Sequence, residues 1–122
     1  MSIPQSGGGL IESLDQPAAY MEAGCKPKAD WRIGTEHEKF GFLEGSRAPL
    51  PYDGPRSIKA LLEGLRDRFG WAEVLEQGKI IGLSRNGASV SLEPGGQFEL
   101  SGAPLLSTHD VKAELENHLS EV

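Results

Sequence analysis

One segment of the chain carries a regular helical pattern of apolar positions. Between residues 57 and 69, apolar side chains recur every three or four positions, which gathers them on one face of a helix. Ser57 or Asp53 can accept the N-cap hydrogen bond, and Gly70 can end the helix. We therefore predict a helix over residues 57–69 with one face packed into a core.

Weaker helical patterns lie near the two ends of the chain. Residues 15–24 are predicted as a helix that Asp15 caps and Gly24 ends, and a last helix is predicted to begin at Ser107 or Thr108. The apolar positions of this last helix form one stripe, made up of Val111, Leu115, Leu119 and Val122. Because the stripe still runs at the final residue, we expect the chain to be a truncated piece of a larger protein.

Short apolar stretches between these helices predict an antiparallel meander. The predicted strands cover residues 71–76, 79–84, 88–93 and 97–101. Gln77-Gly78 joins the first two strands and Asn86-Gly87 the next two. Asn-Gly is a strong hairpin signal because both residues tolerate a positive φ. A longer strand is predicted over residues 31–42.

The order of these elements predicts an α+β fold, with an antiparallel sheet and helices on one face. The strand over residues 31–42 is expected to pair with the meander, and the helices over residues 15–24 and 57–69 are expected to cover one face. Residues 1–14 include three consecutive glycines and are predicted to be a flexible segment. Residues 15–122 are predicted to form one folded unit.

Composition narrows the possible partners. The chain has 122 residues, of which 38% are hydrophobic and 25% charged, and a formal net charge of −6. This acidic balance does not fit a nucleic-acid-binding protein, and no apolar run is long enough to span a bilayer. The single cysteine, Cys25, cannot form an intrachain disulfide, and no secretion signal is visible. We therefore expect a cytoplasmic protein with neither nucleic acid nor membrane as a partner.

Two pairs of glutamates are the candidate chemical groups. Glu36 and Glu38 are two positions apart in the predicted strand over residues 31–42, so both carboxylates point to the same face. Glu93 and Glu99 flank a Pro-Gly-Gly break, where the backbone can approach a ligand closely. Convergent carboxylates repel one another unless a cation binds, and Mg²⁺ prefers oxygen ligands. The pattern predicts a divalent-metal site; a solvated strand face is the alternative.

Neighbouring residues divide between the two faces of these strands. Gln97 shares a face with Glu99, whereas Phe98 and Leu100 are expected to point into the core. His37 faces away from the glutamates beside it in the sequence. We therefore predict that its imidazole is packed or hydrogen-bonded rather than a metal ligand.

Two long stretches carry a family resemblance. WRIGTEHEKFGF (residues 31–42) and SLEPGGQFELSGAPL (residues 91–105) resemble signature stretches of glutamate–cysteine ligase, in the form found in plants and many bacteria. The likeness extends through residues 20–27 and 86–96, and it covers most of residues 15–110. Both stretches are far more specific than a Glu-x-Glu pattern alone.

The resemblance implies an enzyme that uses ATP and Mg²⁺ to join the γ-carboxylate of L-glutamate to L-cysteine, the first step of glutathione synthesis. It also implies that residues 15–122 are the N-terminal part of a catalytic domain with a glutamine synthetase-like fold. The remainder of that domain, or another chain, would complete the site. The implied site residues are Glu36 and Glu38 as catalytic metal ligands, Glu93 and Glu99 as further metal ligands or contacts to glutamate, and Gln97 with Glu99 as substrate-binding residues.

Two other functions remain open from the sequence. The chain can be a non-catalytic fragment or a partner-binding module without activity of its own, using the apolar stripe of its last helix. A glutamate pair can also hydrolyse a glycosidic bond, which requires carboxyl groups roughly 5 to 10 Å apart and one raised pKa. Titration with ATP and Mg²⁺ separates a ligase from such a hydrolase.

Overall fold

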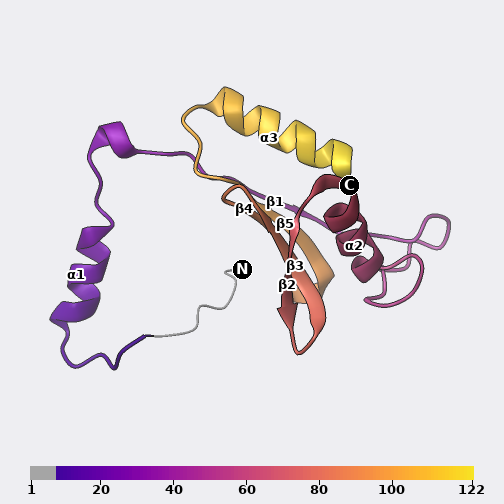
Figure 1. Ribbon diagram of the computed structural model, residues 1–122, viewed down its shortest axis with the longest axis horizontal. Coiled ribbons are helices and arrows are strands. Elements are labelled where there is room, and N and C mark those ends of the chain that lie inside the picture. Colours follow the sequence, from indigo (N-terminus) through magenta and orange to yellow (C-terminus); the bar gives the residue numbers. More distant parts are fainter. Residues whose placement is uncertain (1–7) are drawn as a thin grey trace.

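The meander and the strand before it form one antiparallel sheet (Figure 1). The computed structural model describes residues 8–122. Its strands are β1 (Glu36–Lys39), β2 (Ala72–Glu76), β3 (Lys79–Arg85), β4 (Ala88–Glu93) and β5 (Gln97–Ser101). The strand order is β1-β5-β4-β3-β2, so within the described residues β1 is an edge strand that pairs with β5. The predicted α+β fold with an antiparallel sheet is confirmed.

The two hairpin turns lie where the sequence predicts them. Gln77 and Gly78 have φ values of 48° and 76°, and Asn86 and Gly87 have values of 51° and 86°. Two successive residues with positive φ match the right-handed twist of the flanking strands, which is why Asn-Gly and similar pairs favour this turn. The turns therefore set the pairing of β2 with β3 and of β3 with β4.

The central helix, α2 (Ile58–Phe69), packs one face against the sheet. Ser57 is its N-cap and accepts a hydrogen bond from the Ala60 amide at 3.1 Å, and Gly70 ends it with φ at 71°. Both caps are among those expected from the sequence. The core between helix and sheet is made up of Ile58, Leu62, Leu65, Trp71, Ile80, Leu83, Ala88, Val90, Phe98 and Leu100.

The last helix, α3 (Thr108–Glu121), lies on the same side of the sheet as α2 (Figure 1). It begins at a capping box, in which the Ser107 hydroxyl accepts from the Asp110 amide and the Asp110 carboxylate accepts from the Ser107 amide. This reciprocal pair satisfies two amides that a helix start otherwise leaves unbonded. The predicted cap at Ser107 is therefore confirmed.

The apolar stripe predicted for α3 is only half right. Val111 and Leu115 are partly buried, whereas Leu119 is 49% exposed and Val122 is 44% exposed. His118, which is 2% exposed, is the buried residue of α3. His118 contacts Lys39 of β1 and faces the sheet, whereas Leu119, which the apolar pattern placed on that face, is exposed.

The first helix, α1 (Asp15–Ala23), does not cover the sheet as predicted. Figure 1 shows it apart from the sheet, and none of its residues is buried. Asp15 is not its cap, because the N-cap position is Leu14 and no side chain accepts a hydrogen bond there. The helix has no concentrated apolar face that would bind it to the sheet. The 3₁₀ turn η1 (Lys28–Asp30) follows it and is also exposed.

The flexible segment predicted over residues 1–14 is described only in part. Residues 1–7 lie outside the described residues, and residues 8–14 are exposed and precede the first helix. Between residues 8 and 122, no helix is both long enough and apolar enough to cross a membrane.

The predicted strand over residues 31–42 is much shorter in the structure. Only Glu36–Lys39 forms regular strand, and isolated bridges join Ile33 to Leu105 and Phe42 to Pro49 on either side of it. A strand can extend only as far as a partner accepts its hydrogen bonds, and β5 has just five residues. The length of the partner, rather than the pattern of residues 31–42, therefore sets the length of β1.

Candidate functional site

The pairing of β1 with β5 brings the two glutamate pairs to one face of the sheet. Glu38 lies directly opposite Glu99, and Glu36 lies directly opposite Ser101. Residues that are directly opposite in an antiparallel pair point to the same face. On the other side of β5, Ser91 of β4 is also opposite Glu99. Three strands therefore contribute side chains to a single polar surface.

The turn between β4 and β5 adds two more residues to this surface. Glu93 at the end of β4 is opposite Gln97 at the start of β5. The intervening turn, η2 (Pro94–Gly96), has φ values of 80° at Gly95 and 78° at Gly96, which glycine adopts without strain. We call the sheet surface that bears Glu36, Glu38, Glu93, Gln97 and Glu99 the acidic face.

The acidic face lies opposite the helices. Phe98 and Leu100 alternate with Gln97 and Glu99 along β5, and both are buried in the core beneath α2 and α3. The sequence predicts this division correctly. Because both helices pack against the other surface of the sheet, neither of them covers the acidic face.

The Ser101 hydroxyl stabilises the charge of Glu99, the most buried carboxylate on this face. Glu99 is 3% exposed, and the Ser101 hydroxyl donates a hydrogen bond to its Oε1 at 2.6 Å. This bond lowers the pKa of Glu99 below its ordinary value, with burial acting in the opposite direction and a hydrogen bond involving Glu93 adding to the lowering. The Ser91 hydroxyl lies 3.5 Å from Glu93 Oε1. Glu99 is therefore held as a carboxylate, the form that binds a cation.

The acidic face fits a hard divalent cation in its chemistry, without being a closed metal cage. Among residues 8–122, no three His, Cys, Asp or Glu side chains are gathered closely enough to hold an ion. Mg²⁺ does not need such a cage, because it keeps several waters and is commonly bound by one or two carboxylates together with substrate phosphates. Glu36 and Glu38 are exposed, so their side chains can change rotamer to reach an ion near Glu99. The metal and substrate roles of these residues remain predictions.

A second polar cluster lies behind the acidic face, between β1 and α3. Lys39 Nζ is 2.9 Å from His37 Nδ1 and 2.8 Å from His118 Nε2. The contact confirms the prediction that the imidazole of His37 is hydrogen-bonded. His118 was not predicted from the sequence, since an isolated histidine in a helix carries no periodic signal.

Burial controls the charges in this second cluster. It lowers the pKa of Lys39 below the ordinary value, although the nearby Glu38 carboxylate acts to raise it. Burial, reinforced by the Lys39 charge, also lowers the pKa of His118 to about 4. His118 is therefore neutral at pH 7, which allows one of its ring nitrogens to accept a hydrogen bond from the lysine.

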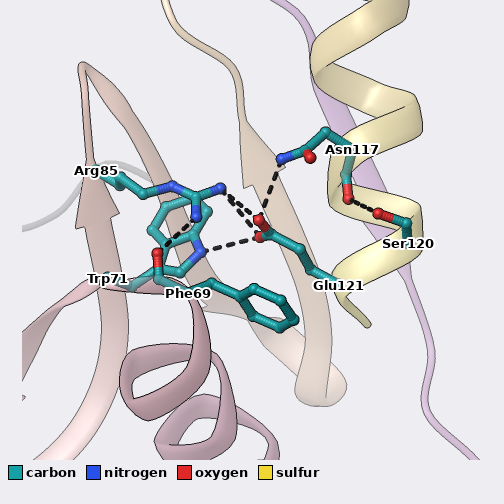
Figure 2. A network of polar contacts seen from close by, with 6 residues as sticks. All are labelled: Phe69, Trp71, Arg85, Asn117, Ser120 and Glu121. Carbon is teal, nitrogen blue, oxygen red and sulfur yellow. Dashed lines mark hydrogen bonds and ion pairs between the residues drawn. The ribbon is translucent and has the colours of Figure 1, made fainter.

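A third network fastens the C-terminal end of α3 to the sheet (Figure 2). Arg85 Nη2 lies 2.9 Å and 3.0 Å from the two carboxylate oxygens of Glu121, and Trp71 Nε1 donates to Glu121 Oε2 at 3.1 Å. Arg85 also donates to the Phe69 carbonyl, and Asn117 donates to Glu121. These contacts join α2, β3 and α3 at one point.

Comparison with known proteins gives the family. Residues 32–122 match the model of glutamate–cysteine ligase family 2. The chain is 53% identical over 104 residues to glutamate–cysteine ligase A, chloroplastic, of Oryza sativa subsp. japonica, a match that covers 85% of this chain and 20% of the relative. It is 55% identical over 103 residues to the chloroplastic enzyme of Solanum lycopersicum, covering 84% of this chain and 19% of the relative.

The relatives also show how much of the family's length this chain covers, and they correct the expected localisation. The chain spans about one fifth of the length of these relatives. A third relative, from Arabidopsis thaliana, is 54% identical over 104 residues and covers 85% of this chain and 19% of its own length. All three relatives are named as chloroplastic, which contradicts the expectation of a cytoplasmic protein. Since the family model covers most of its length, this chain belongs to glutamate–cysteine ligase family 2.

Proposed function

We propose that this chain supplies the metal- and substrate-binding strands of an enzyme that joins L-glutamate to L-cysteine with consumption of ATP. In this reaction an oxygen of the glutamate γ-carboxylate attacks the γ-phosphorus of ATP, and ADP leaves. The cysteine amine then attacks the resulting acyl phosphate, which forms the amide bond of γ-glutamylcysteine, releases inorganic phosphate and yields a proton. The family and the names of the relatives support this assignment.

One observation carries the proposal. The strand register places Glu38 directly opposite Glu99, and it puts Glu36, Glu93 and Gln97 on the same face. These residues come from both stretches that resemble the family, and the fold joins the two stretches into one surface.

The acidic face suits the chemistry of phosphoryl transfer to a carboxylate. Such a transfer brings a triphosphate against an anionic acceptor, and bound Mg²⁺ would neutralise part of that charge. Glu36 and Glu38 are the proposed Mg²⁺ ligands, with Glu93 and Glu99 completing the coordination or contacting glutamate. Gln97 can donate and accept hydrogen bonds, and we assign it, with Glu99, to the binding of substrate.

The sheet supports a glutamine synthetase-like arrangement for the complete enzyme. One face is covered by α2 and α3, and the opposite face carries the proposed ligands. The proposed enzyme also needs groups that hold the nucleotide base and the cysteine. We assign those groups to the remainder of the catalytic domain or to another chain.

The experiment compares this chain with a full-length protein of the family that contains it. Cysteine-dependent ADP release, measured with a coupled assay, should be robust in the full-length protein and absent or very weak in the 122-residue chain. Positioning supplies much of the rate in phosphoryl transfer, so an incomplete site should lose most of it. In the full-length protein, Glu36→Gln or Glu38→Gln should abolish turnover, whereas Glu76→Gln on the exposed β2 should not. A fully active Glu38→Gln enzyme would overturn the proposal.

A further inference from the structure

The strand that carries Glu36 and Glu38 is a short strand at the edge of the sheet. Within the described residues, β1 has four residues and pairs with β5 as an edge strand. Glu38 lies directly opposite Glu99, and like charges directly opposite each other destabilise a strand pair. Backbone hydrogen bonds from Gly102 to Thr35 and between Ile33 and Leu105 hold the start of β1, whereas its pairing with β5 ends at Lys39. The far end of β1 therefore depends on other interactions as well.

One such interaction lies on the other surface of β1. Lys39 follows Glu38 in the chain and points to the helix side of the sheet, where its ammonium group lies 2.8 Å from His118 Nε2 and 2.9 Å from His37 Nδ1. Hydrogen bonds from a charged donor are stronger than those between neutral groups. Because side chains alternate along a strand, holding Lys39 toward α3 directs Glu38 toward the acidic face.

His118 is itself fixed against both strands of the pair. Its ring stacks on Phe98 with centroids 6.2 Å apart and planes inclined by 12°. Phe98 is the cross-strand partner of Lys39, so His118 contacts the pair that adjoins Glu38 and Glu99. One turn further along α3, Glu121 fastens the helix to Trp71 and Arg85. A rigid helix therefore presents His118 to the end of β1.

We propose that His118 is a positioning residue for the acidic face, because through Lys39 it holds β1 in the register that keeps Glu36 and Glu38 beside Glu99. The identity of the ion bound by the acidic face rests on the proposed function, but the role of His118 in positioning β1 does not. His118 lies on the surface of the sheet opposite the glutamates, so it acts on a bound ion only through the strand. Its loss should weaken metal binding without removing any ligand.

The first test is the Mg²⁺ affinity of the 122-residue chain, measured by isothermal titration. His118→Phe keeps an aromatic ring on Phe98 but removes the acceptor for Lys39, and we expect its Kd for Mg²⁺ to rise about tenfold or more. His118→Gln keeps an acceptor close to the position of Nε2, and its Kd should stay within about threefold of the parent. His109→Phe, the same substitution at an exposed position of α3, is the matched control and should change nothing.

The second test does not depend on metal. Without Mg²⁺, amide hydrogen exchange in Glu36–Lys39 should become about tenfold faster in His118→Phe, while exchange in α2 stays at the parent rate. If His118→Phe unfolds the whole chain, Lys39→Met replaces it, and the same change confined to β1 is expected. The control is Lys59→Met, at a lysine of α2 whose side chain is 43% exposed.

The two tests separate the possible failures. If the parent chain binds no Mg²⁺, the proposed metal site is wrong, and exchange in β1 alone decides the role of His118. Unchanged exchange in β1 in both His118→Phe and Lys39→Met overturns the positioning role. A His118→Gln variant that loses as much Mg²⁺ affinity as His118→Phe would also overturn the positioning role, because the acceptor for Lys39 would then have no effect.

Discussion

Removing the Glu121 carboxylate should destabilise the chain far more than removing an exposed carboxylate from the same helix. The side chain of Glu121 is 7% exposed and accepts hydrogen bonds from Arg85, Trp71 and Asn117. Glu121→Ala leaves the Arg85 guanidinium, which is 23% exposed, without its partner. It also leaves the indole N–H of Trp71 without an acceptor.

The magnitude follows from what remains unpaired. Breaking a fully buried ion pair costs about 3–5 kcal/mol, and an unsatisfied buried donor costs about 1–3 kcal/mol. Arg85 is partly exposed and can regain some hydration, so the lower part of the first range applies. We expect Glu121→Ala to reduce the free energy of unfolding by about 3 kcal/mol. Glu121→Gln, which keeps one oxygen acceptor, should cost less.

The assay is equilibrium urea unfolding followed by circular dichroism and by tryptophan fluorescence, in which the change should come mainly from Trp71, because Trp71 is buried and Trp31 is exposed. Glu116→Ala is the matched control, because the Glu116 side chain is 62% exposed and its ion pair with Lys112 lies on the surface of α3. That substitution should change the free energy of unfolding by less than about 0.5 kcal/mol. Equal effects of Glu121→Ala and Glu116→Ala would refute the claim that the network in Figure 2 fastens α3 to the sheet.

Three further predictions concern pH, close packing and charge. His118 has a folded-state pKa of about 4 against an ordinary value of 6.5. Its neutral form should therefore contribute about 3 kcal/mol to the free energy of unfolding above pH 6.5, and this contribution should be lost as the pH falls toward 4. Urea unfolding across that pH range checks this. Gly82→Ala should lower the melting temperature, because its Cβ would lie 2.7 Å from a backbone carbonyl of β4, whereas Gly64→Ala, with open space in α2, should raise it. Glu38→Gln should stabilise the metal-free chain by up to about 1 kcal/mol in urea unfolding, because it removes the charge opposite Glu99, and a clear loss of stability would contradict this.

Turn chemistry made the sheet predictable from the sequence. Asn86-Gly87 and the Pro-Gly-Gly break specify backbone conformations that few other residues adopt, so both turns lie where they are expected. Once these turns are placed, alternation alone puts Gln97 and Glu99 on one face of β5 and Phe98 on the other. The register between β1 and β5 did not follow from local signals, because it depends on residues about 60 positions apart.

The helices were predictable only where their apolar face has a partner. α2 has a concentrated apolar face and both expected caps, and it lies where its pattern placed it. Residues 15–24 have acceptable helix formers but no such face, so α1 forms without packing on the sheet. In α3 the inward positions go to His118 and Glu121, whose polar partners Lys39 and Arg85 come from distant strands. Apolar periodicity carries no information about such contacts.

Paramagnetic Mn²⁺ can show whether the acidic face binds a divalent cation. Mn²⁺ takes the same kind of oxygen ligands as Mg²⁺, and it broadens the NMR signals of nearby amides. At substoichiometric Mn²⁺, we expect the amide signals of β1 and of the turn between β4 and β5 to broaden first, while those of α2 remain sharp. Glu38→Gln should weaken this pattern. Broadening that is spread evenly over the exposed carboxylates, or that is unchanged in Glu38→Gln, would mean that the acidic face is not a specific cation site.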